Sequence, residues 1–163
     1  MSRLDSVIRR LEAQRACLDM AAALVGEVPG VVFELGLGNG RTYDHLRERL
    51  PRREIFVFER KVAAHPSCVP DDEHLLLGDF GASLPGAVER FAGSVALIHG
   101  DVGSGRAESD AEVAALLSRT LAPALTPGAI VLCDQELSLK GAEPLVLPEG
   151  VRPGRYYLYR KPI

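Results

Sequence analysis

The chain has 163 residues, of which 47% are hydrophobic and 25% are charged, and its formal net charge is −3. This length and composition predict one folded globular domain and exclude intrinsic disorder as the main state. The small negative charge argues against bulk nucleic-acid binding, which needs a clear positive excess. No apolar run approaches the ~20 residues of a transmembrane helix, so we expect a soluble protein.

The N-terminal segment has the pattern of an amphipathic helix. Apolar side chains recur at three- and four-residue intervals over residues 3–25, and Gly26 and Pro29 end the pattern. We therefore expect a single domain over 1–163, in which an N-terminal helix within 1–28 precedes a core over 31–163.

The core alternates short apolar runs with helical patterns. Strands are predicted over 31–35, 55–58, 75–77, 95–98 and 129–133. Helices are predicted after residue 40, over 83–91 and over 110–122, where Ser109 and Glu112 fit a capping box. Residues 145–147 and 156–159 form a predicted antiparallel hairpin. This order indicates a doubly wound, mostly parallel α/β sheet that ends in an antiparallel hairpin.

A glycine-rich loop follows the first predicted strand. Glu34 is followed by Gly36, Gly38 and Gly40, which let the backbone turn tightly and approach a ligand. The next helix offers free N–H groups to a carboxylate or phosphate. A dinucleotide fingerprint would place its third glycine at position 41, where the chain has Arg41. A plain tight turn is the alternative.

Acidic residues follow the next two predicted strands. Glu59 comes 25 residues after Glu34, where a carboxylate can accept hydrogen bonds from both hydroxyls of a ribose. Asp79 follows Gly78 and could accept from an adenine amine, with Phe80 as an apolar wall. Taken alone, Glu59 could equally be a solvated charge and Gly78-Asp79 an ordinary turn.

Together these features resemble the successive motifs of class I S-adenosylmethionine-dependent methyltransferases. Leu125-Thr126-Pro127-Gly128, before the fifth strand, adds a further motif of that class. The resemblance runs from about residue 31 to residue 161 and is closest to small bacterial methyltransferases. It implies a Rossmann-like fold with a seven-stranded sheet, S-adenosyl-L-methionine as the cofactor and S-adenosyl-L-homocysteine as the product.

The resemblance also implies roles for residues. Glu34 and the glycine loop would hold the methionine end of the cofactor, Glu59 the ribose, Asp79 and Phe80 the adenine, and His99 would lie beside the sulfonium. The implied cofactor-binding set is Glu34, Gly36, Gly38, Asn39, Gly40, Arg41, Thr42, Glu59, Arg60, Gly78, Asp79, Phe80, His99 and Gly100.

Methyl transfer from a sulfonium needs mainly proximity and orientation, with a general base only where the acceptor carries a proton. His99 and Asp101, which follow the fourth strand, are the catalytic candidates. A histidine hydrogen-bonded at a strand end is the alternative for His99. Asp101 with Asp134 and Gln135 resembles the magnesium ligands of catechol-type O-methyltransferases, but Gln135 replaces their asparagine and we expect no metal.

We predict an enzyme that methylates a small molecule, because the chain has no inserted substrate domain and no signature of nucleic-acid base methylation. A non-catalytic S-adenosylmethionine-binding or regulatory module is the alternative, and a nucleotide-binding protein is a third reading. Residues 134–143 leave scarcely room for a helix, so we expect the N-terminal helix of the same chain or of a second copy to cover the sheet there. Three widely spaced cysteines predict a reduced, cytoplasmic protein, and no membrane partner is expected.

Overall fold

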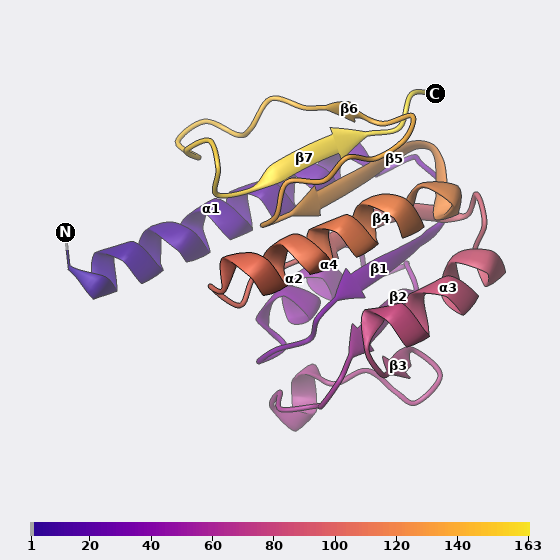
Figure 1. The fold of residues 1–163 in the computed structure, drawn as a ribbon, viewed down its shortest axis with the longest axis horizontal. Helices are drawn as coiled ribbons and strands as arrows, with labels where there is room; N and C mark the ends of the chain where they lie inside the picture. The colour runs from indigo at the N-terminus through magenta and orange to yellow at the C-terminus, as the bar shows by residue number, and fades with distance from the viewer. Residues whose placement is uncertain (1) are drawn as a thin grey trace.

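The computed structural model describes residues 2–163, which form a seven-stranded sheet of order β3-β2-β1-β4-β5-β7-β6 (Figure 1). The first five strands run parallel, and β7 is antiparallel to both β5 and β6. The strands are β1 (Val31–Leu35), β2 (Ile55–Glu59), β3 (Leu75–Leu77), β4 (Val95–Gly100), β5 (Leu125–Cys133), β6 (Glu143–Pro144) and β7 (Tyr157–Arg160). The predicted mostly parallel sheet with an antiparallel C-terminal pair is confirmed.

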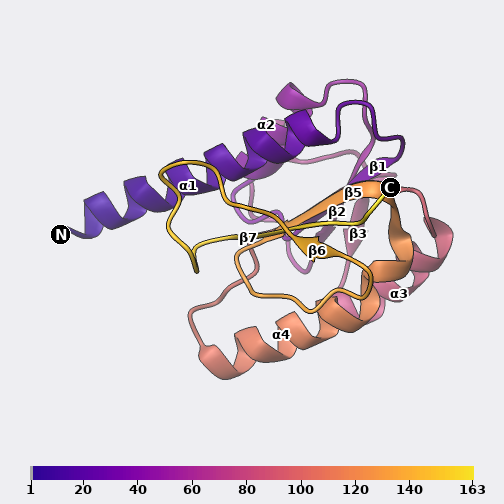
Figure 2. The same cartoon turned by 90° about the horizontal axis from the view of Figure 1, so that it is seen from above.

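Helices cover both faces of the sheet (Figure 2). One face carries α1 (Arg3–Leu24) and α2 (Arg41–Arg49), and the other carries α3 (Phe80–Arg90) and α4 (Ala107–Thr120). Two short 3₁₀ turns, Pro66–Cys68 and Ala122–Ala124, complete the elements. No helix in residues 2–163 is long and apolar enough to cross a membrane.

Strand alternation divides the core into two layers. In β1, Phe33 packs with the layer under α3 and α4, whereas Val32 packs with the layer under α1 and α2. Glu34 is two residues beyond Val32, so its side chain shares the face that α1 and α2 cover. Burial on both sides explains why the parallel strands read as continuous apolar runs in the sequence.

The N-terminal helix of the same chain covers the sheet beside the short 134–142 segment. It packs on β4 and β5, and its first turn is closed by a capping box between Ser2 and Asp5. Its N-terminal turns extend beyond the sheet (Figure 1). Coverage of this face therefore needs no second copy of the chain.

Several element boundaries differ from the prediction, among them the start of α3, which lies at Phe80 and not at residue 83. The Ser109 capping box is wrong, because α4 begins at Ala107 after Arg106 and the Asp110 carboxylate instead accepts from the N–H groups of Ser104 and Gly105. Strand β5 begins at Leu125, where it pairs with β4, four residues before the predicted start at residue 129. Residues 145–147 are not a strand, and β6 is limited to two residues before them.

Candidate functional site

The glycine loop, residues 36–40, lies at the carboxyl end of β1 and leads into α2. Gly40 is the N-cap of α2 with φ of 83°. A Cβ at this position would lie 2.5 Å from the Cβ of Cys68, so both the conformation and the close approach require glycine. The loop thus brings backbone rather than side chains to the start of α2, where the first N–H groups of the helix have no intrahelical partner.

A cavity of about 160 Å³ lies between the glycine loop and α1. Its lining joins three parts of the chain that are far apart in sequence: the glycine loop with the first turn of α2, Asp101 after β4, and Arg10, Leu11 and Gln14 of α1. The three α1 residues were not among the site residues predicted from the sequence. The available signal was Gln14 itself, a polar residue within an apolar stripe that includes Leu11 and Leu18.

Glu59 holds the glycine loop against the end of β2. Its Oε2 accepts from the N–H groups of Leu37 (2.8 Å) and Gly38 (3.1 Å), and its Oε1 accepts from Arg60 (2.7 Å) and Lys61 (3.1 Å). Partial burial opposes ionisation, but these donors outweigh it and lower the pKa of Glu59 below its usual value. A carboxylate has about four acceptor sites, so this network occupies the side chain fully.

A second acid, Glu34, is buried with His99 beneath α1 and α2. Glu34 Oε1 accepts from the Thr42 hydroxyl, and Glu34 Oε2 lies 2.7 Å from His99 Nδ1. Both side chains are 0% exposed. Burial opposes protonation of the imidazole, but the Glu34 carboxylate raises the pKa of His99 above its usual value. Within residues 2–163, His99 Nε2 is a buried nitrogen without a hydrogen-bond partner.

Gln14 of α1 connects two sides of the site. Its Nε2 donates to Asp101 Oδ2 (2.7 Å) and to the Tyr156 hydroxyl (2.7 Å). Arg10 lies 3.4 Å from the same Asp101 oxygen. Asp101 is therefore held at the rim of the cavity while its side chain stays partly exposed. Burial of the ring raises the pKa of Tyr156, so its hydroxyl remains protonated at neutral pH.

The remaining predicted residues lie along the same edge of the sheet. Gly78 donates its N–H to the Glu59 carbonyl, and the exposed Arg60 and Asp79 side chains approach to 3.8 Å. Phe80 packs against the core at the start of α3. The structure thus brings the predicted set to the carboxyl ends of β1 to β4, but Glu34, Glu59, Asp79, Phe80 and His99 do not line the 160 Å³ cavity.

The Asp134 carboxylate binds the backbone of the loop after β4, a contact that the sequence did not reveal. Its two carboxylate oxygens accept from the N–H groups of Val102 (3.0 Å) and Gly103 (2.9 Å), and Gln135 donates to one of them. These bonds fix the loop that follows β4. In the described part of the chain, no three His, Cys, Asp or Glu side chains are grouped closely enough to hold a metal ion.

Comparison with known proteins gives concordant matches. A family described as S-adenosyl-L-methionine methyltransferase matches residues 1–161. A crystal structure described as an S-adenosyl-L-methionine methyl transferase from Silicibacter pomeroyi DSS-3 is 43% identical, covers 99% of each chain and has a TM-score of 0.92. Human methyltransferase-like protein 13 in complex with SAH shares the fold at 15% identity and a TM-score of 0.50, covering 98% of this chain and 81% of its own. No curated protein matched.

Proposed function

The chain belongs to the S-adenosyl-L-methionine methyltransferase family, and we propose that it methylates a small-molecule acceptor with the glycine loop and Asp101 as the centre of its site. S-adenosyl-L-methionine, the cofactor of the family, supplies an activated methyl group. Family membership favours the enzyme over a non-catalytic binding module. The observation that carries the proposal is the cavity in which loop backbone, the N-terminus of α2 and Asp101 meet.

The groups around the cavity fit the methionine end of the cofactor. The N-terminus of α2, with the Arg41 side chain beside it, suits its carboxylate. The N–H groups of Gly40 and Arg41 already donate to Leu37 and Asn39, so the following N–H groups of the first turn are the ones offered to the ligand. The partly exposed Asp101 carboxylate suits its ammonium group, a role for which Glu34 is less available because Thr42 and His99 already occupy it. The close backbone of Gly36 and Gly38 leaves room for the ligand itself.

Glu59 supports the same site by holding the loop in its binding shape. The predicted contact between Glu59 and the ribose hydroxyls stays a prediction, because four backbone donors already share its oxygens. Adenine contacts by Asp79 and Phe80 stay predictions as well. Their place at the end of β3, next to Glu59 in the sheet, supports them.

For catalysis we propose separate roles for the two candidate residues. Asp101 lies at the rim of the cavity, where its pairing with the cofactor's ammonium group would orient the methyl donor for in-line transfer, and its action as a general base stays a prediction. His99 is fully buried and hydrogen-bonded to Glu34, so it acts as a positioning residue for the end of β4 rather than on the acceptor directly. Orientation of the acceptor supplies most of the rate.

The net charge, the exposed residues of α1 and the cysteines support proposals on the acceptor class, the oligomeric state and the location in the cell. A net charge of −3 and a single domain favour a small molecule over nucleic acid.

Leu4, Val7 and Ile8 of α1 are 68%, 47% and 44% exposed, which supports a homo-oligomer formed through this helix. The three free cysteines are consistent with a reduced, cytoplasmic location. A solution mass equal to one chain would contradict the oligomer.

Labelled methyl transfer tests the proposal. The protein is incubated with S-adenosylmethionine carrying a labelled methyl group and a cell extract divided into small-molecule, RNA and protein fractions. We expect label in the small-molecule fraction, strongly reduced incorporation with Asp101→Asn, and unchanged incorporation with Asp72→Asn, an exposed acid at the opposite end of the parallel strands. Label confined to RNA or protein would contradict the proposed acceptor class.

A further inference from the structure

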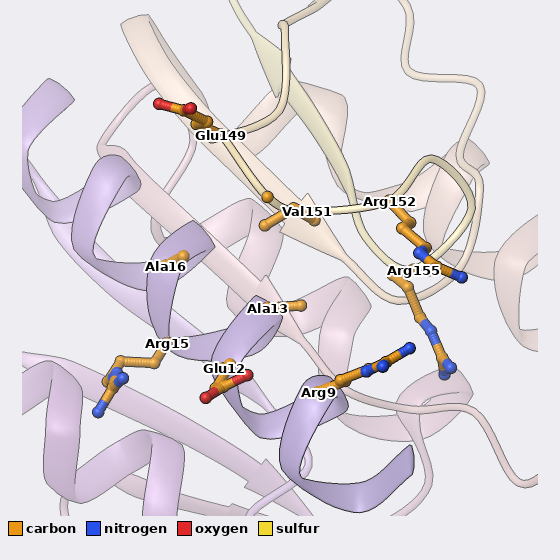
Figure 3. Close-up of a pocket in the computed structure, with 10 residues that line it drawn as sticks. Arg9, Glu12, Ala13, Arg15, Ala16, Glu149, Val151, Arg152 and Arg155 are labelled. Carbon is orange, nitrogen blue, oxygen red and sulfur yellow. The ribbon is translucent and has the colours of Figure 1, made fainter. Parts of the chain in front are cut away.

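A second cavity, of about 360 Å³, lies on the other side of α1 from the glycine loop. One wall is the α1 face that carries Arg9 and Ala13, and the other is the turn that precedes β7 and carries Val151, Arg152 and Arg155 (Figure 3). We call this cavity the arginine groove. Its floor is formed by small and apolar side chains, so its charge lies at the walls.

Local structure explains why the arginines gather there. On α1, Arg9 and Ala13 are four residues apart and therefore share a helix face. In the turn, the N–H of Val151 donates to the Pro148 carbonyl (3.1 Å) and that of Arg155 donates to the Arg152 carbonyl (3.3 Å). These two successive turns set Arg152 and Arg155 side by side, and Arg9 extends toward them (Figure 3).

The groove carries more positive than negative charge. Four arginines, Arg9, Arg15, Arg152 and Arg155, line it with two glutamates, although the whole chain carries −3. Within residues 2–163 none of these four guanidinium groups has an ion pair or hydrogen bond. By contrast, Arg47 and Arg49 on α2 pair with Asp44 and Asp19. Guanidinium groups that converge without a carboxylate between them attract an anion.

The groove and the methyl-transfer site lie on opposite sides of α1, and within residues 2–163 they share no lining residue. Ala13 in its floor precedes Gln14, and Arg155 in its wall precedes Tyr156. Gln14 joins these two walls by its 2.7 Å bond to the Tyr156 hydroxyl and reaches Asp101 by its other 2.7 Å bond. An acceptor with one end in the groove and the other at the glycine loop must therefore span α1, whose diameter is about 10 Å.

We propose that the arginine groove binds the phosphate group of the acceptor, which makes the substrate a phosphorylated small molecule; this rests on the proposed small-molecule methyl transfer. Three guanidinium groups, those of Arg9, Arg152 and Arg155, converge at one end, while Glu149 lies at the other and Glu12 lies beside Arg9 on α1 (Figure 3). Such an excess of positive charge matches a phosphate dianion better than a single carboxylate. Among residues 2–163, no aromatic side chain lines the groove, so it offers bases of single-stranded nucleic acid no ring on which to stack.

Phosphate binding tests this proposal on protein saturated with S-adenosylhomocysteine. Inorganic phosphate is titrated at constant ionic strength, and binding is followed by chemical-shift changes of the arginine Nε–Hε groups. We expect saturable binding that is about tenfold weaker in Arg152→Ala/Arg155→Ala and in Arg9→Ala. The control Arg52→Ala/Arg119→Ala removes two exposed arginines that lie elsewhere and should bind phosphate like the wild type.

The outcomes separate this proposal from the proposed function. Absence of phosphate binding, or equal binding in the groove variants, overturns the phosphate site while S-adenosylhomocysteine binding stays intact. A single-stranded RNA oligonucleotide is run in parallel. If its affinity rises with length and exceeds that of phosphate by far, the groove is a nucleic-acid surface and the small-molecule proposal is wrong. Failure of S-adenosylhomocysteine to bind would instead contradict the proposed function.

Discussion

The Nδ1 atom of His99 lies 2.7 Å from Oε2 of Glu34, and neither side chain reaches solvent. Burial of this carboxylate and this imidazole is tolerated because the two groups are hydrogen-bonded to each other, and the Thr42 hydroxyl donates to the second carboxylate oxygen. The pair joins β1 to β4 directly behind the proposed cofactor cavity. Its protonation is therefore linked both to folding and to the shape of the site.

The raised pKa of His99 predicts that stability falls as pH rises. The folded state binds the His99 proton more tightly than the unfolded state, whose imidazole titrates near ~6.5. The contribution is complete below that value and is lost as pH rises through the higher pKa of the folded protein. Urea unfolding between pH 6 and pH 9 should show a slope of up to about 1.4 kcal/mol per pH unit from this group.

The control for this slope is Glu34→Gln/His99→Gln, which removes both titrating groups of the buried pair. Its unfolding free energy should lose this part of the pH dependence. The exposed His65→Gln should keep it. A wild-type slope that is identical to that of the double variant would show that His99 is not preferentially protonated in the fold.

Glu59→Gln should weaken cofactor binding by about tenfold, because an amide nitrogen cannot accept from the N–H groups that Glu59 holds. The lowered pKa of Glu59 also predicts how the stability of the fold depends on pH. Its stabilising effect is present above the unfolded pKa and is lost as pH falls through the folded one. Calorimetry of S-adenosylhomocysteine binding measures the first effect, with the exposed Glu48→Gln as the matched control.

Gly40→Ala should destabilise the protein more than Gly38→Ala. Both glycines have positive φ, but a Cβ at position 40 would meet Cys68 at 2.5 Å, whereas one at position 38 meets nothing within 4 Å. We expect a loss of roughly 1 kcal/mol for Gly38→Ala and about 3 kcal/mol for Gly40→Ala in urea unfolding. Equal losses would mean that backbone conformation alone sets the requirement for glycine.

Gln14→Met should loosen the N-terminal half of α1 over the cavity. The side chain is 5% exposed and donates to both Asp101 and Tyr156, so its loss leaves the buried Tyr156 hydroxyl without this donor. We expect a loss of about 1–3 kcal/mol in unfolding free energy and faster amide hydrogen exchange in residues 3–14. Arg10→Ala, which removes only the exposed 3.4 Å ion pair to Asp101, should cost about 0–1 kcal/mol.

Strands β1, β2, β4 and β5 were predictable from sequence because each is buried on two faces. Four of the five parallel strands begin at the predicted residue, and Glu34 and His99 fall at their ends as expected. Helix starts were less predictable, since the start of α4 depends on how Asp110 holds the preceding loop. Contacts between segments far apart in the chain form the hydrogen-bond network around Glu59 and place Gln14 over the cavity. A pattern of neighbouring residues in the sequence does not predict such contacts.

Calorimetric titration with S-adenosylmethionine and S-adenosylhomocysteine, with NAD as the control ligand, tests the central claim most directly. The wild type should bind the first two saturably and NAD not at all. Asp101→Asn should weaken S-adenosylmethionine binding, because the ammonium group loses its carboxylate partner, while Asp72→Asn binds normally. A folded wild-type protein that binds neither ligand at millimolar concentration would contradict the assignment of the glycine loop as the cofactor site.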